Sequence, residues 1–126
     1  MHPLRIEGTS DTPTILLDVE ENVFQISGRS LPEDPTAFYS PVIEWLEAFS
    51  NFVEPGKKIK LEVRYDYFNT ASSKLFLDIL DVFEDMYSKS IDVCVEWQYV
   101  KGDDDMMEAG EGYMDLLDIP FYIKEV

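Results

Sequence analysis

A run of hydroxyl side chains offers the clearest candidate chemistry in this sequence. Residues 69–74 read Asn69-Thr70-Ala71-Ser72-Ser73-Lys74. Threonine and serine hydroxyls can accept a phosphoryl group, and a lysine nearby can pair with the charge that the group adds. The same residue types are common where a helix begins, because their side chains satisfy free backbone N–H groups. The two interpretations are compatible, since one residue can begin a helix and also be modified.

The hydroxyl run lies between a predicted strand and a predicted helix. Before it, apolar and polar residues alternate over residues 59–67, which is the period of a strand with one buried face. After it, apolar residues recur at helical spacing: Leu75, Phe76, Ile79, Leu80, Phe83 and Met86. Asn69 is a suitable N-cap, so we expect Thr70 to be the first helical residue. Free N–H groups and the helix dipole favour an anion there.

Carboxylates offer a second candidate chemistry. The triplet Asp103, Asp104 and Asp105 contains ligands for a hard cation, but it lacks the glycine and distal glutamate of an EF-hand loop. A charge run in a loop is usually solvated, so we predict no metal site. Three further acids, Asp78, Asp81 and Asp85, fall on the polar face of the predicted helix after Thr70. Their spacing is that of a helix face that is exposed either to solvent or to a partner protein.

The sequence lacks the residues that the common catalytic and nucleotide-binding motifs require. His2 is the single histidine, and we expect it to lie in a frayed terminus, so no Ser-His-Asp or Cys-His arrangement has a base. Neither GxGxxG nor a P-loop is present. Cys94 falls inside a predicted strand and is most simply a packed residue. We therefore expect a non-catalytic protein without a cofactor; the alternative is a metal-dependent enzyme that uses Asp66 and the acidic triplet.

Composition indicates one folded, strongly acidic domain. The chain has 126 residues, of which 45% are hydrophobic, enough for a core. It has 26 acidic and 10 basic residues, a net charge of −16, which opposes binding to nucleic acid and to anionic membranes. The charge suits a solvated surface, or steering toward a basic partner. One cysteine, no secretory signal and no membrane-length apolar run indicate the cytoplasm.

The remaining segments predict a single α/β domain over residues 1–126. We expect an irregular start over residues 1–12, followed by strands at 13–19 and 23–28 and a helix from Asp34 or Thr36 to before Pro55. After the strand and helix on either side of the hydroxyl run, we expect a strand at 91–99 and a weak helix at 106–117, which Gly110 and Gly112 interrupt. The chain should end in an edge strand over residues 121–124. Strands joined through a helix should be parallel and the opening hairpin antiparallel, giving a mixed sheet with helices packed on it. Strand order is left open.

Four segments of the sequence resemble one protein family. The turn Tyr67-Phe68-Asn69-Thr70-Ala71-Ser72-Ser73-Lys74, followed by Phe-Leu-Asp-Ile-Leu-Asp over residues 76–81, looks like the SiaC-type regulatory phosphoproteins. Ile-Glu-Gly-Thr-x-x-Thr-Pro at residues 6–13, Gly-Arg-Ser-x-Pro-Glu at 28–33 and Pro-Phe at 120–121 are similar too. The family consists of bacterial single-domain proteins with a fold related to the anti-sigma-factor antagonist (STAS) domain.

The resemblance implies a phosphorylation switch. A partner kinase phosphorylates the threonine of the turn in this family, and a PP2C-type phosphatase removes the phosphate. The bare form binds and activates a diguanylate cyclase, which raises cyclic di-GMP and promotes biofilm formation or aggregation. Carried onto this sequence, the acceptor is Thr70, with Ser72 and Ser73 as fallback acceptors. The expected partner-binding residues are Tyr67, Asn69, Thr70, Ser72, Ser73, Lys74 and Asp78. The alternative output is an anti-sigma-factor antagonist in a partner-switching cascade.

Overall fold

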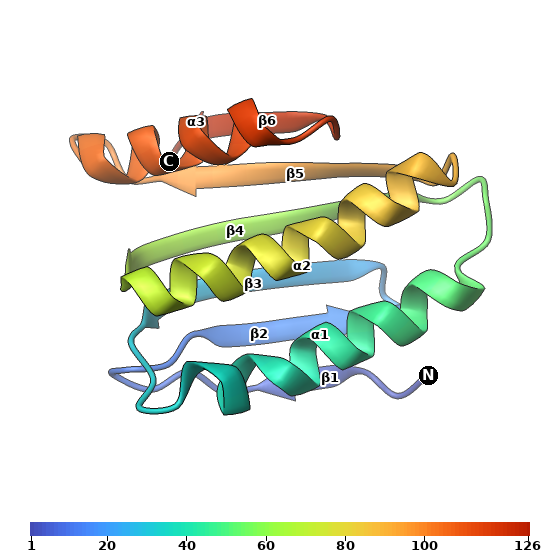
Figure 1. Ribbon diagram of the computed structural model, residues 1–126, viewed down its shortest axis with the longest axis horizontal. Helices are drawn as coiled ribbons and strands as arrows, with labels where there is room; N and C mark the ends of the chain where they lie inside the picture. Colours follow the sequence, from blue (N-terminus) through green and yellow to red (C-terminus); the bar gives the residue numbers. More distant parts are fainter.

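The computed structural model describes residues 1–126 as a six-stranded sheet that carries three helices (Figure 1). The strands are β1 (Leu4–Ile6), β2 (Thr14–Asp18), β3 (Val23–Ser30), β4 (Lys58–Phe68), β5 (Asp92–Tyr99) and β6 (Phe121–Glu125). The helices are α1 (Pro35–Phe52), α2 (Thr70–Ser88) and α3 (Asp104–Leu116). The predicted single α/β domain with a mixed sheet is confirmed.

The strands lie in the sheet in the same order as in the chain, β1 to β6. The β1–β2 and β2–β3 pairs are antiparallel, and the three pairs from β3 to β6 are parallel. Each parallel pair is joined through a helix, and all three helices cover the same face of the sheet (Figure 1). This is the expected result when successive crossovers share one hand and the order never reverses. Both predicted orientations are confirmed, and β6 lies at an edge as expected.

The alternation in β4 separates a buried face from an open one. Ile59, Leu61, Val63 and Tyr65 are at most 2% exposed and face the helices, whereas Lys60 and its alternate neighbours face solvent. On the helix side of the sheet, 25 buried residues form one hydrophobic cluster that reaches from β2 to β6. The core is therefore continuous under α1, α2 and α3. It gives the start of α2 a fixed support.

The expected irregular start of the chain is wrong for residues 4–6. Leu4–Ile6 forms β1, which pairs antiparallel with β2, and Leu4 and Ile6 pack against the core. A strand of three residues with two half-buried side chains has too little pattern to be recognised from sequence. Its position depends on tertiary contacts with β2 and α1.

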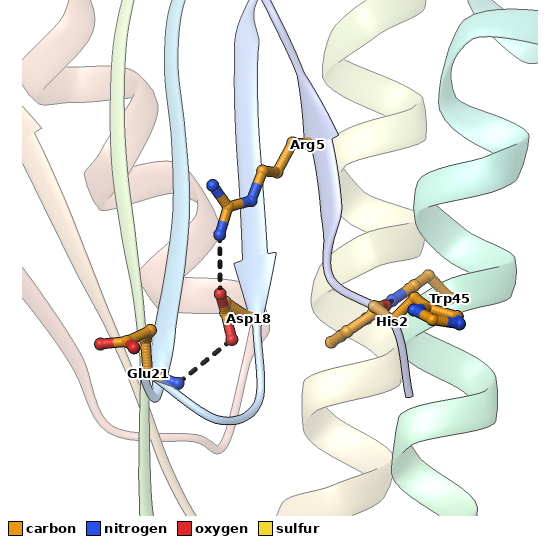
Figure 2. Close-up of polar contacts among 5 residues, drawn as sticks. All are labelled: His2, Arg5, Asp18, Glu21 and Trp45. Atoms are coloured by element: carbon orange, nitrogen blue, oxygen red, sulfur yellow. Dashed lines mark hydrogen bonds and ion pairs between the residues drawn. The ribbon is translucent and has the colours of Figure 1, made fainter.

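Side-chain contacts hold the N-terminal segment on both sides (Figure 2). Arg5 Nη2 donates to Asp18 Oδ2 at 3.1 Å, and the other carboxylate oxygen of Asp18 accepts from the Glu21 backbone N–H at 3.1 Å. On the helix side, Trp45 Nε1 donates to the His2 carbonyl oxygen at 2.9 Å. The prediction of a frayed terminus around His2 is therefore wrong.

One predicted boundary in the first half of the fold moves by two residues. The β3 strand continues through Gly28 to Ser30 instead of ending at Gly28, with a register shift between Gly28 and Arg29. Gly28 has a φ of +110°, a region that favours glycine. α1 begins at Pro35 with Asp34 as its N-cap, between the two starts that the sequence left open, and Tyr39 is the fully buried aromatic residue of its first half.

The weak pattern of α3 has a structural explanation. Asp103 caps the helix by accepting a hydrogen bond from Met106 N at 3.1 Å, so α3 begins at Asp104, two residues earlier than expected. Gly110 is buried against the indole of Trp97, where an added Cβ would overlap the ring. Trp97 Nε1 also donates to the Met106 carbonyl oxygen at 2.9 Å. A glycine that lowers helix propensity here permits close helix–sheet packing.

Candidate functional site

Thr70 lies on the surface where the central strand passes into a helix. Asn69 is the N-cap of α2 and Thr70 is its first residue, both as predicted, and β4 ends at Phe68, one residue beyond the predicted strand. Asn69 Oδ1 accepts from Ser72 N at 2.9 Å, and the Asn69 carbonyl accepts from Ser73 N at 3.0 Å. The side chain of Thr70 is exposed. Its hydroxyl is thus open to another protein while its backbone belongs to a capped helical turn.

Ser73 and Lys74, which follow in the first turns of α2, differ in how far their side chains are tied to the protein. Ser73 is half-buried; its hydroxyl donates to the Thr70 carbonyl oxygen at 2.6 Å. Its own carbonyl oxygen accepts from Tyr113 Oη on α3 at 2.9 Å. Lys74 is exposed and takes part in none of the four ion pairs of the structure. Its ammonium group is therefore available to an anion.

Ser72 points the opposite way from Thr70. It is 0% exposed, although it lies only two residues further along α2. A kinase or an output protein cannot reach its hydroxyl in this structure. We therefore remove Ser72 from the set of accessible acceptors and partner contacts, where the sequence had placed it.

Ser72 ends a chain of buried hydroxyl groups. Its Oγ donates to the Ser30 carbonyl oxygen at 3.1 Å and accepts from Ser30 Oγ at 2.8 Å. Ser30 Oγ lies 2.5 Å from Tyr39 Oη, which lies 3.0 Å from Tyr65 Oη. Each hydroxyl has one proton to donate, and Ser30 donates its proton to Ser72. Tyr39 must therefore donate to Ser30, and Tyr65 must donate to Tyr39. Four hydroxyls from β4, α1, β3 and α2 thus form one connected network beneath the turn.

Burial keeps the tyrosines of this region neutral. It raises the pKa of Tyr65 well above its usual value and also raises the pKa of Tyr39, although the hydrogen bonds that Tyr39 shares with Ser30 and Tyr65 lower the pKa of Tyr39. Burial likewise raises the pKa of Tyr113 to about 12. At neutral pH each hydroxyl therefore keeps the proton that it donates.

Exposed residues beside Thr70 form a stripe along α2. Thr70, Lys74 and Asp78 are each four residues apart, are all exposed, and lie on one side of the helix. Tyr67, at the end of β4, is 46% exposed, and the guanidinium carbon of Arg29 lies 5.5 Å from the centre of its ring. The structure thus brings together the predicted contacts Tyr67, Asn69, Thr70, Lys74 and Asp78, with Ser73 half-covered, and separates Ser72 from them.

Beyond Asp78 the stripe leads into an acidic groove between α1 and α2. The groove has a volume of about 370 Å³ and contains four carboxylates: Glu47, Asp78, Asp81 and Asp85. Burial raises the pKa of Asp81, and the charges of Asp78 and Glu84 raise it further. The acids of α2 therefore repel one another in the isolated protein. A basic segment of a partner would relieve that repulsion.

The acids proposed for a metal-dependent enzyme are not assembled into a site. Asp103 is occupied as the cap of α3, and no group of three or more His, Cys, Asp or Glu side chains could hold a metal ion. Cys94 is buried on β5, and burial raises the pKa of its thiol. The alternative that relied on Asp66 and Asp103–105 thus finds no supporting geometry. No helix has the length and apolar character needed to cross a membrane.

Sequence reasoning missed four residues that hold the site in place: Ser30, Tyr39, Tyr65 and Tyr113. In the sequence, Tyr65 occupies one of the apolar positions of the alternating strand. A tyrosine on a buried face needs a partner for its hydroxyl, and that requirement is the signal that could have indicated a polar network. The identity of the partners could not be read, because Ser30 and Ser72 are 42 residues apart.

Comparisons with known proteins agree with one another. The model of a family described as SiaC family regulatory phosphoprotein matches residues 6–126. The chain is 31% identical over 124 residues to the protein PA14_02130 of Pseudomonas aeruginosa (strain UCBPP-PA14), covering 98% of this chain and 97% of that one.

Solved structures give the same result. SiaC of Pseudomonas aeruginosa superposes with a TM-score of 0.91 at 30% identity, and all of both chains is covered. The activator SiaC in its complex with the diguanylate cyclase SiaD of Pseudomonas aeruginosa superposes with a TM-score of 0.89 at 30% identity, covering 98% of this chain and 99% of that one.

Proposed function

Because this chain belongs to the SiaC family of regulatory phosphoproteins, we propose that reversible phosphorylation of Thr70 switches its binding to an output enzyme. The chain is a regulator rather than an enzyme. The observation that carries the proposal is the exposed hydroxyl of Thr70 at the capped start of α2. A phosphate there meets backbone N–H groups and the positive end of the helix dipole, so the fold tolerates it.

The proposed modification is an ordinary phosphoryl transfer. Thr70 Oγ attacks the γ-phosphorus of ATP bound to a partner kinase, a base of the kinase takes the hydroxyl proton, and ADP leaves. A PP2C-type phosphatase returns the hydroxyl by hydrolysis. Ser73 is the remaining fallback acceptor, with its hydroxyl already bonded to the Thr70 carbonyl. Both reactions take place in the cytoplasm, where ATP is available.

The proposed output is a diguanylate cyclase. The bare protein binds and activates the cyclase, which raises cyclic di-GMP and promotes biofilm formation or aggregation. The support is that Pseudomonas aeruginosa SiaC is the activator of the cyclase SiaD, and that it shares this fold over its whole length. The contact surface consists of Tyr67, Asn69, Thr70, Ser73, Lys74 and Asp78.

Phosphate would break this contact electrostatically. It adds roughly −1.5 to −2 charges to the docking surface of a chain that already carries −16. A charge of that size placed in an interface must be desolvated, and it repels acidic neighbours. A hundredfold loss of affinity needs only about 3 kcal/mol.

The proposal is tested on protein purified from its native cells. Intact mass and peptide mapping should show a single phosphate on Thr70 in a fraction of the molecules. A pull-down with Thr70→Ala should recover a cyclase, and one with Thr70→Glu should not. Thr36→Glu is the matched control, because Thr36 is exposed in the first turn of α1 and should keep the cyclase. Recovery of an anti-sigma kinase in place of a cyclase would support the partner-switching alternative.

A further inference from the structure

We propose that Ser72, Ser30 and Tyr39 are positioning residues for phosphoryl transfer: their buried hydroxyls fix the acceptor turn, so that the kinase receives Thr70 as part of a folded helix start. This inference rests on the proposed function, since it concerns how the same threonine is modified. It adds that the substrate of the kinase is the folded turn and not an extended segment.

One carbonyl group anchors the turn on both sides of Thr70. The Ser30 carbonyl oxygen accepts from Asn69 N at 3.0 Å and from Ser72 Oγ at 3.1 Å. Asn69 precedes the acceptor and Ser72 follows it by two residues. Because both bonds end on the last residue of β3, the backbone of Thr70 is held between two points fixed to the sheet.

The hydroxyl network leaves no buried side-chain polar atom without a partner. Ser30 Oγ donates to Ser72 and accepts from Tyr39, and Tyr39 in turn accepts from Tyr65. Removal of one hydroxyl leaves a buried neighbour unpaired, which is costly in a region of low dielectric. The network therefore holds the turn as a unit, and a change at Tyr39 on α1 reaches Ser72 on α2 through Ser30.

A further contact fixes the turn from the side of α3. Tyr113 Oη donates to the Ser73 carbonyl oxygen, so α3 also supports the first turn of α2. Its ring packs against Phe76 with centroids 5.2 Å apart. The exposed side chains that would contact a kinase, Tyr67 and Lys74, are not part of any of these bonds. The structure thus separates residues that present the turn from residues that hold it.

This separation gives opposite expectations for two mechanisms. If the kinase needs the folded turn, loosening the network misplaces Thr70 Oγ relative to the γ-phosphorus and lowers kcat. KM should keep its wild-type value, because the exposed side chains that contact the kinase are unchanged. If the kinase must unwind the turn before transfer, loosening the network makes that step easier and raises the rate. The sign of the change in kcat therefore distinguishes the two.

The experiment uses the full chain and the kinase activity isolated from native cells by its transfer of phosphate from ATP to the wild-type protein. For Ser72→Ala and Tyr39→Phe we expect kcat to fall about tenfold or more, with KM within about twofold of wild type. Ile59→Val is the control for lost stability, because Ile59 is buried near the opposite end of β4. It should leave kcat unchanged. Amide hydrogen exchange at Ser72 and Ser73 should be faster in Ser72→Ala and unchanged in the control.

Each outcome bears on the inference. An unchanged or raised kcat in Ser72→Ala contradicts it and leaves the proposed function intact, as does an equal fall in Ile59→Val. If Ser72→Ala does not fold, Tyr39→Phe decides, because it removes only the hydroxyl that donates to Ser30. Absence of phosphate on Thr70 of the wild-type protein would contradict both the inference and the function on which it rests.

Discussion

The hydroxyl oxygens of Ser30 and Ser72 lie 2.8 Å apart in the core, although 42 residues separate them in the chain. Two residues before Ser72, the hydroxyl of Thr70 is exposed. One helical turn therefore presents one hydroxyl to solvent and buries another. The buried hydroxyl ties the turn to the sheet, and the exposed one is available for modification.

The two serines of the turn should differ in their effect on stability. Ser72→Ala leaves the buried hydroxyl proton of Ser30 without an acceptor and removes one of the two hydrogen bonds to the Ser30 carbonyl oxygen, and it should cost about 1–3 kcal/mol of unfolding free energy. Ser73→Ala removes a bond to the Thr70 carbonyl near the surface and should cost less than about 1 kcal/mol. Urea unfolding of both variants measures the difference. Equal losses would show that the buried network is not stabilising.

Stability should fall in strong alkali. A tyrosine in the unfolded chain loses its proton near pH 10, whereas burial raises the pKa of Tyr113 to about 12 and that of Tyr65 well above its usual value. The stability linked to these shifts is complete below about pH 10 and is lost as the pH rises through the folded pKa, because the unfolded chain releases its protons first.

Denaturant unfolding between pH 9 and pH 12 measures this fall as a decreasing free energy of unfolding. Tyr113→Phe should make the decrease less steep, since that hydroxyl no longer titrates. Tyr122→Phe is the control, because Tyr122 is 56% exposed on β6. A stability that rises with pH in this range would contradict the neutral, buried network.

The two glycines of α3 should respond in opposite directions to alanine. Gly110→Ala places a Cβ into the Trp97 indole and should destabilise the protein by about 1–3 kcal/mol. Gly112→Ala meets no atom within 4 Å and should stabilise it by about 0.5–1 kcal/mol through higher helix propensity. Thermal unfolding of the two variants provides the comparison. A destabilised Gly112→Ala would show that the exposed side of α3 is constrained by something other than propensity.

The acids of α2 should be mutually repulsive at low salt. Asp81 has Asp78, Glu84 and Asp85 within one helical turn, so Asp81→Asn should raise the unfolding free energy by about 0.5 kcal/mol. The gain should shrink at about 0.5 M salt, where charges are screened.

Asp105→Asn gives the contrast for this charge effect. Asp105 lies in the first turn of α3, where a carboxylate interacts favourably with the helix dipole. Its removal should therefore lower stability at low salt. If Asp81→Asn and Asp105→Asn changed the unfolding free energy in the same direction, the total charge of the protein, and not the position of each acid, would determine the change in stability.

The sequence predicted those parts of the site that depend on local pattern. The alternation in β4, the Asn69 cap and the start of α2 at Thr70 are all properties of a few neighbouring residues, and all are confirmed. The burial of Ser72 could not be predicted, because serine has the same helix-start preference on either side of a helix. Only contacts with Ser30, from a distant part of the chain, distinguish it from Thr70.

The same distinction holds for the fold. Periodicity predicted α1, α2 and the five longer strands, and helix connections predicted which pairs are parallel. The strand β1 was missed because three residues carry almost no period, and it is positioned by contacts with β2 and Trp45. The strand order does not follow from the sequence, because it depends on which faces pack together and not on any single segment.

The most direct test of the switch is calorimetric titration of the diguanylate cyclase with bare protein, with protein phosphorylated on Thr70, and with Thr70→Ala. We expect the bare protein and Thr70→Ala to bind equally well and to activate the cyclase. The phosphorylated protein should bind about a hundredfold more weakly, which corresponds to about 3 kcal/mol. Equal affinity of the phosphorylated and bare forms would contradict the proposal that a phosphate on Thr70 controls partner binding.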